Sequence, residues 1–132
     1  MPRAQWPLCH HRPSIEVTLA VAHGGQAALK TLLADTGAGS RMSAFDLILE
    51  DHECLRCGGY PMGFVNLGGA YKGSFPTYTL TVCLPALGFA DALLVVGVPS
   101  VSTGFDGIAC FNFLNRFTYG NFGDPGQFGL EC

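Results

Sequence analysis

The chain has 132 residues, of which 48% are apolar and 13% charged, with a formal net charge of -3 at pH 7. This length suits one domain, and 7 Lys and Arg residues against 10 Asp and Glu residues exclude the basic surface on which nucleic-acid binding depends. No stretch approaches about 18 consecutive apolar residues and prolines interrupt the first residues, so we expect no membrane span, no targeting signal and a cytoplasmic protein.

The N-terminal third of the chain predicts an arm followed by two strands. Residues 1–13 lack hydrophobic periodicity and contain three prolines, so we interpret them as an arm that a partner subunit could order. Apolar and polar residues alternate over residues 14–21, which predicts a half-buried strand. The Gly pair within residues 23–26 suits a tight hairpin turn, and the apolar residues 27–34 predict a returning strand covered on both faces.

The second strand leads into a turn of small residues that carries one carboxylate. The sequence there reads Leu32-Leu33-Ala34-Asp35-Thr36-Gly37-Ala38-Gly39-Ser40. Small side chains let another backbone approach closely, which is how a buried acid can be presented for chemistry. Asp35 is therefore a candidate catalytic acid, and its loop residues are Thr36, Gly37, Ala38 and Ser40. The alternative is an aspartate that only closes a turn or caps a helix.

A helix and a glycine-tipped hairpin are expected next. Residues 44–55 carry apolar side chains at helical spacing, with Ser43 as the N-cap and Cys57-Gly58-Gly59 as the end of the helix. Residues 60–73 are an apolar stretch bent around Gly68-Gly69 and flanked by aromatic residues. Such a hairpin suits a mobile lid over a binding cleft, and an ordinary surface hairpin is the alternative. Its candidate binding residues are Val65, Leu67, Gly68, Gly69 and Tyr71.

The remaining pattern is again typical of β structure. Residues 75–84 alternate between apolar and polar side chains, and residues 92–98 form the continuous apolar run of a buried strand. A loop follows over residues 99–104. Residues 118–122 and 127–132 flank a Gly-Asp-Pro-Gly turn, which predicts a terminal hairpin.

Two segments resemble the retropepsin-like aspartic proteases, the single-domain relatives of retroviral proteases. The first is the apolar run followed by Asp35-Thr36-Gly37, Ala38 and Ser40. In the second, Ile108-Ala109 supplies an apolar pair, and the short helix that follows it in the family corresponds to Asn112-Phe113-Leu114-Asn115-Arg116-Phe117. The resemblance covers about residues 14–131 in the right order and at the right spacing. Cys110 departs from the pattern, because the family has Gly there and a positive φ would strain a cysteine.

This resemblance implies a mostly β, single-domain acid protease fold, a closed barrel-like sheet with one or two short helices. The protease domain would span residues 14–132 after the arm of residues 1–13. Because a chain of this length carries a single Asp-Thr-Gly, the active enzyme would be a homodimer, and the low charge of the chain also favours a buried subunit interface.

In that dimer, Asp35 and its symmetry mate would share one proton, activate a water molecule and polarise the scissile carbonyl of a peptide or protein substrate. Thr36 would tie the two loops together, Gly37 would admit the substrate, and Ala38 and Ser40 would keep the loop small. The hairpin over residues 62–72 would act as the flap.

Two alternative interpretations assign the chain a function other than peptide hydrolysis. One is a catalytically inactive dimer that binds peptides or serves assembly. The other is a zinc or thiol protein built on Cys54-x-x-Cys57, but zinc needs a tetrahedral set of ligands, and a thioredoxin-like pair starts a helix rather than ending one. We therefore predict no metal and no cofactor, and free thiols for the six cysteines.

Overall fold

The computed structural model describes residues 2–21, 27–38, 45–69, 71–101 and 104–132. Strand residues make up 55% of the described part of the chain, which contains two short α-helices, α1 (Asp51–Arg56) and α2 (Phe111–Leu114), and the 3-10 helix η2 (Pro85–Leu87). The strands are β1 (Arg3–Pro7), β2 (Ser14–Leu19), β3 (Ala28–Ala34), β4 (Leu47–Glu50), β5 (Gly63–Gly68), β6 (Lys72–Leu84), β7 (Phe89–Val98), β8 (Gly107–Ala109), β9 (Thr118–Gly120) and β10 (Gln127–Glu131). The predicted mostly β fold class is confirmed.

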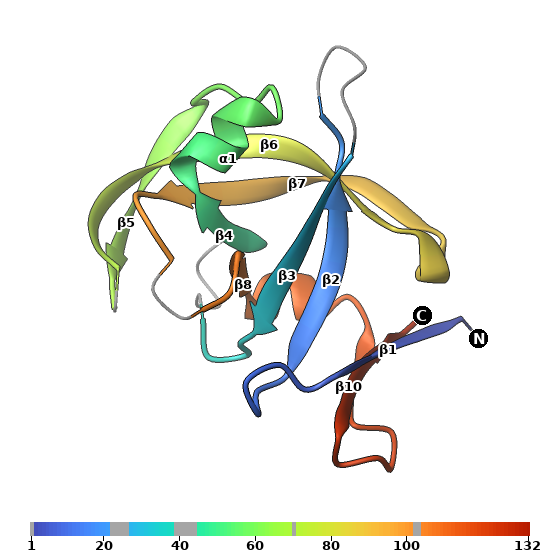
Figure 1. Ribbon diagram of the computed structural model, residues 1–132. Helices are drawn as coiled ribbons and strands as arrows, with labels where there is room; N and C mark the ends of the chain where they lie inside the picture. Colours follow the sequence, from blue (N-terminus) through green and yellow to red (C-terminus); the bar gives the residue numbers. More distant parts are fainter. Residues whose placement is uncertain (1, 22–26, 39–44, 70, 102–103) are drawn as a thin grey trace.

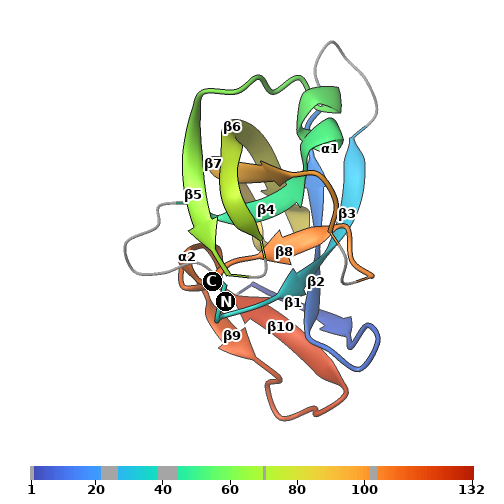
Figure 2. The same cartoon turned by 90° about the vertical axis from the view of Figure 1, so that its left-hand side faces the viewer.

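Six strands close into a barrel (Figure 1). The larger sheet has the order β2-β3-β8-β4-β7-β6-β5, and an additional pairing between β2 and β6 joins the first and sixth strands. The pairs β3–β8 and β4–β7 are parallel, whereas the other pairs in this sheet are antiparallel. Strand β5 stays at the outer edge, paired with β6 (Figure 2). The predicted closed, barrel-like sheet is confirmed.

Two apolar clusters explain why the central strands are apolar on both faces. Successive side chains of a strand point to opposite faces, so neighbouring residues enter different clusters. Leu32 packs into the main cluster, together with residues such as Leu47 and Phe113. Leu33 packs into a second cluster, together with Ile48, Val96 and Cys110. Strand β3 therefore reaches its C-terminal end buried on both sides, as its apolar run predicts.

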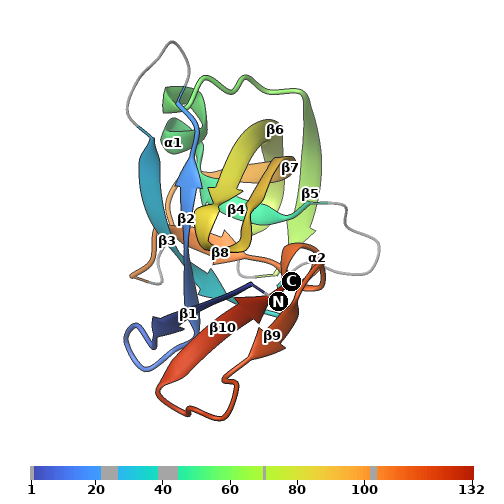
Figure 3. The same ribbon diagram turned by 90° about the vertical axis from the view of Figure 1, so that its right-hand side faces the viewer.

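The two ends of the chain form a second, three-stranded sheet of order β1-β10-β9. Strand β1 pairs antiparallel with β10, from Arg3 opposite Glu131 to Pro7 opposite Gln127, and the termini lie side by side (Figure 3). The segment predicted as an arm thus contains a strand, and the partner of that strand is the chain's own C-terminal strand. The domain boundary at residue 14 stays a prediction.

The helix predicted over residues 44–55 is wrong in its first half. Residues 47–50 form β4, which lies between β8 and β7, and α1 begins only at Asp51, with Glu50 rather than Ser43 at its N-cap. Ser43 lies outside the described residues. The apolar run Leu47-Ile48-Leu49 fits a helix or a strand by spacing alone, and pairing with two neighbouring strands decides between them.

The other strand predictions are confirmed with shifted ends. Strand β6 begins at Lys72, earlier than predicted, because its first residues pair with β5. The terminal hairpin forms between β9 and β10. The turn predicted over residues 23–26 lies outside the described residues. In the described part of the chain, no helix is long and apolar enough to cross a membrane.

Candidate active site

Asp35 directly follows the last residue of β3, at the point where the buried strand ends and a tight turn begins. The carboxylate Oδ1 accepts a hydrogen bond of 2.9 Å from the N–H of Gly37, and the Asp35 carbonyl accepts one of 3.1 Å from the N–H of Ala38. A Cβ at position 37 would lie 3.3 Å from Oδ1, so a larger residue would crowd the carboxylate. The turn thus holds one carboxylate oxygen with its own backbone.

Residues 109–111, from the last residue of β8 to the first residue of α2, bond to this loop and to the segment before β4. The Asp35 N–H donates to the Ala109 carbonyl at 3.0 Å, and the Phe111 N–H donates to the Ala38 carbonyl at 3.2 Å. Between them, the N–H of Cys110 donates to the Asp46 carbonyl at 3.0 Å. Residues 109–111 therefore connect the Asp35 turn, the start of α2 and the segment that enters β4. The two segments of the sequence that resemble the aspartic proteases lie against each other.

Cys110 fits this place without backbone strain. Its φ is -85° and its ψ is 167°, which is extended backbone that any residue adopts, so this position does not require the positive φ that would strain a cysteine. The side chain is fully buried. Burial, and then the negative charges of Asp35 and Asp46, raise the pKa of Cys110 to about 12. The thiol is therefore neutral and unreactive at physiological pH.

A buried carboxylate that the sequence did not reveal lies beside this framework. Asp46 is 2% exposed, and its Oδ1 accepts hydrogen bonds of 2.9 Å from both Asn112 Nδ2 and Arg116 Nη2. Its Oδ2 accepts a longer bond of 3.2 Å from the N–H of Leu94. The guanidinium of Arg116 also lies 3.7 Å from the carboxylate of Asp91. Asp46, which directly precedes β4, thus bonds to β7 through Leu94, to α2 through Asn112, and to Arg116 just beyond α2. The available signal in the sequence was a lone acid within the apolar run of residues 45–49.

The predicted lid is a two-stranded hairpin whose arms are β5 and the start of β6. The register runs from Gly63 opposite Thr77 to Gly68 opposite Lys72. Side chains alternate along β5: Val65 and Leu67 are half-buried and pack against the second cluster, as Ala38 of the Asp35 loop does, whereas Phe64 is 72% exposed.

The structure thus brings one face of the hairpin and the Asp35 loop to the same apolar cluster. Tyr71 joins that cluster as well. Gly68 and Gly69 are exposed at the tip, and Thr36 and Gly37 are exposed in the loop. Ser40 lies outside the described residues.

Both cysteines of the Cys-x-x-Cys pair are buried. Cys54 lies within α1, and Cys57 ends it. Burial, followed by the nearby Asp51 and Cys57, raises the pKa of Cys54 to about 12, and burial also raises the pKa of Cys57. In the ranges that the structure describes, all six cysteines are free and no group of three or more metal-ligating side chains occurs. Protonated, buried thiols of this kind favour packing over redox or metal chemistry.

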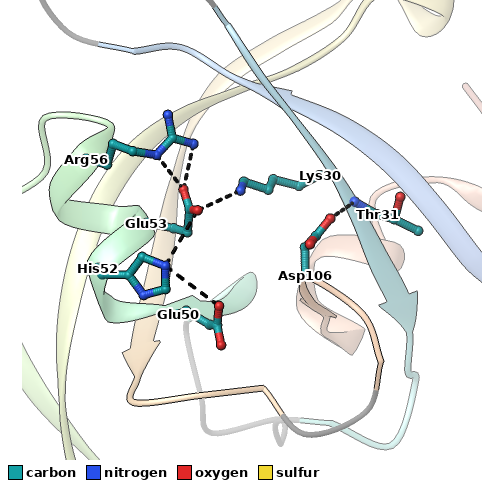
Figure 4. Close-up of polar contacts among 7 residues, drawn as sticks. All are labelled: Lys30, Thr31, Glu50, His52, Glu53, Arg56 and Asp106. Carbon is teal, nitrogen blue, oxygen red and sulfur yellow. Dashed lines mark hydrogen bonds and ion pairs between the residues drawn. The ribbon is translucent and has the colours of Figure 1, made fainter.

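An ionic cluster ties α1 to the strand that carries Asp35 (Figure 4). The carboxylate of Glu53 lies 3.0 Å from Lys30 Nζ of β3 and 2.7 Å from Arg56 Nη2. His52 Nε2 lies 3.6 Å from the same carboxylate. Burial alone would raise the pKa of Glu53, but its hydrogen bonds and charge interactions with Lys30 and Arg56 outweigh burial and lower it.

The lowered pKa of Glu53 predicts a pH-dependent contribution to stability. A carboxyl group whose pKa is lower in the folded than in the unfolded protein stabilises the fold at pH values above its unfolded-state pKa. This stabilisation is lost as the pH falls through the folded-state pKa. We expect Glu53→Gln to reduce the free energy of unfolding at pH 7 by roughly 1 kcal/mol or less, because water screens the cluster. The difference from the wild type should shrink below the ordinary glutamate pKa of 4.5. Urea unfolding from pH 7 to pH 3 measures it, and a constant difference contradicts the assignment.

Comparison with known proteins supports the fold. No protein-family model matches the chain, and no curated protein matches it by sequence. Among solved structures, it is similar to a retropepsin-like aspartic protease from Rickettsia conorii, with a TM-score of 0.59 and 14% identity. That match covers 97% of this chain and 89% of the other. An identity this low shows the fold alone, so the chain has the fold of a retropepsin-like aspartic protease.

Proposed function

We propose that the protein is an aspartic endopeptidase in which Asp35 from each of two subunits forms the catalytic pair. The observation that carries the proposal is the position of Asp35: a carboxylate at the end of a buried strand, in a turn braced by residues 109–111, within a retropepsin-like fold. Peptides or proteins are the substrates on this proposal. No cofactor is required, because the reaction needs only water and two acids.

The geometry of the carboxylate supports this chemistry. Oδ1 accepts the N–H of Gly37 at 2.9 Å, so the turn itself orients the carboxylate. Two adjacent carboxylates cannot both ionise, so the pair holds one proton. The ionised acid removes a proton from the attacking water while the protonated acid donates its proton to the scissile carbonyl oxygen, which gives a tetrahedral diol. When the C–N bond breaks, the proton taken from water passes to the departing amine, and a hydroxyl of the diol returns its proton to the other carboxylate.

On this proposal, the second carboxylate comes from a second copy of the chain. Asp46 is the other acid near residue 110, but Arg116, Asn112 and the Leu94 N–H hold its two oxygens. A symmetric dimer would present an identical Asp35 across its two-fold axis. Thr36, exposed beside Asp35, and Ser40 would hydrogen-bond around the paired loops. The hairpin with Val65, Leu67, Gly68 and Gly69 would close over the bound peptide as a flap.

Cleavage of a diverse peptide mixture, followed by mass spectrometry from acid to neutral pH, tests the proposal. If the site is shared, activity per chain should rise with protein concentration and level off where sedimentation shows the dimer, because monomers carry half a site. A folded dimer that cleaves no peptide at any pH contradicts the enzyme and favours the inactive peptide-binding dimer. A monomer with full activity contradicts the shared site.

A further inference from the structure

Tyr71 carries a polar atom that the fold does not satisfy. The residue directly precedes β6 in the hairpin and packs against the second cluster, to which Ala38, Val65 and Leu67 also belong. Its hydroxyl is buried and, among the described residues, is the one side-chain polar atom that is buried without a hydrogen-bond partner. Buried hydroxyl groups are nearly always bonded, because losing water without a replacement is unfavourable. This exception needs a cause.

Packing alone does not account for the hydroxyl. Phenylalanine offers the same ring and fills comparable hydrophobic contacts elsewhere in this cluster, as Phe75 does on the same hairpin. Compared with phenylalanine, a tyrosine at position 71 therefore adds a polar atom that lowers the stability of the free protein. The position of this residue is informative, because Tyr71 packs against the cluster to which the hairpin and the Asp35 loop both contribute.

We propose that the Tyr71 hydroxyl hydrogen-bonds the main chain of a peptide held between the hairpin and the Asp35 loop. This inference rests on the proposed function and adds a specific binding group to it. An extended peptide carries an N–H and a C=O at each residue, and a phenol can both donate and accept. Peptide binding would give the hydroxyl the partner that it lacks in the free protein, so its unfavourable burial is relieved only in the complex.

Tyr71→Phe tests this proposal because it removes only the hydroxyl. We expect kcat/KM for a peptide cleaved by the wild type to fall by about three- to ten-fold, the effect of one hydrogen bond. At the same time the thermal midpoint of the free protein should rise by about 2–5 °C, because an unsatisfied polar atom is gone. Tyr60→Phe is the matched control, since Tyr60 is 72% exposed and its hydroxyl is in water. It should change neither quantity.

Measuring both kcat/KM and the thermal midpoint distinguishes peptide binding by the Tyr71 hydroxyl from a purely structural role. An unchanged kcat/KM for Tyr71→Phe overturns the proposal, as does a fall in the thermal midpoint, which would mean that the hydroxyl is already bonded in the free protein. Failure of the proposed function is visible one step earlier, because the wild type itself then cleaves no peptide.

Discussion

Replacing Asp35 with Asn is expected to lower peptide cleavage by at least about 10³-fold while leaving the fold and the dimer intact. Asparagine keeps the shape of the side chain and an oxygen that can still accept the N–H of Gly37, so the turn should persist. It cannot take a proton from water, so the pair loses its base. Initial rates on a wild-type substrate, with sedimentation of both proteins, measure the effect.

Mixed dimers make this test sharper. If each site needs one Asp35 from each chain, a dimer of one wild-type and one Asp35→Asn chain is inactive, and activity falls as the square of the wild-type fraction. An equal, fully exchanged mixture then retains about one quarter of the activity. Two affinity tags on the two chains allow the mixed dimer to be isolated. A linear decrease, or an active mixed dimer, would show that each chain works alone.

Replacing Arg116 with Met is expected to lower the free energy of unfolding by about 3 kcal/mol, which is a large fraction of the stability of a single domain. The Asp46 side chain is 3% exposed, so removing its ion-pair partner leaves a buried charge with only the bonds from Asn112 and Leu94. Met keeps much of the apolar stem of arginine, so the lost charge dominates the effect. Urea unfolding at neutral pH measures it.

Two further variants distinguish a buried charge from lost packing. Asp46→Asn combined with Arg116→Met removes both charges, so it should recover at least half of the stability that the single variant loses. Arg3→Met provides a surface control, because Arg3 pairs with Glu131 at side-chain exposures of 42% and 22%. Its effect should stay within about 1 kcal/mol. Equal losses in the single and double variants would mean that the ion pair is not the cause.

The sequence predicted the strand and the turn at Asp35 because their signals are local. A continuous apolar run, one acid and a series of small residues specify a buried strand that ends in a tight turn, and β3 and the Gly37 hydrogen bond confirm that structure. The hairpin of β5 and β6 could also be predicted from the sequence, because alternating side chains and a glycine tip encode it within one segment.

The features that the sequence did not predict depend on partners far along the chain. Residues 47–50 have a spacing that suits a helix, and only β7 and β8 make them a strand. Arg3–Pro7 look irregular because of their prolines, yet they pair with β10. The Asp46–Arg116 pair joins residues 70 positions apart. The sequence around Asp46 does not distinguish a buried acid from a surface acid, because the distant residues that bond to it are not visible in the sequence.

The pairing of β1 with β10 has a consequence for how the chain folds. Arg3 lies opposite Glu131, so this sheet closes a loop of nearly the whole chain, and such closure costs more entropy than any local pairing. Long-range pairings also slow folding. On the ribosome, β2 to β8 emerge well before residues 127–131, so β1 waits without its partner until those residues have been made. We expect this terminal sheet to assemble last, after the barrel that carries Asp35.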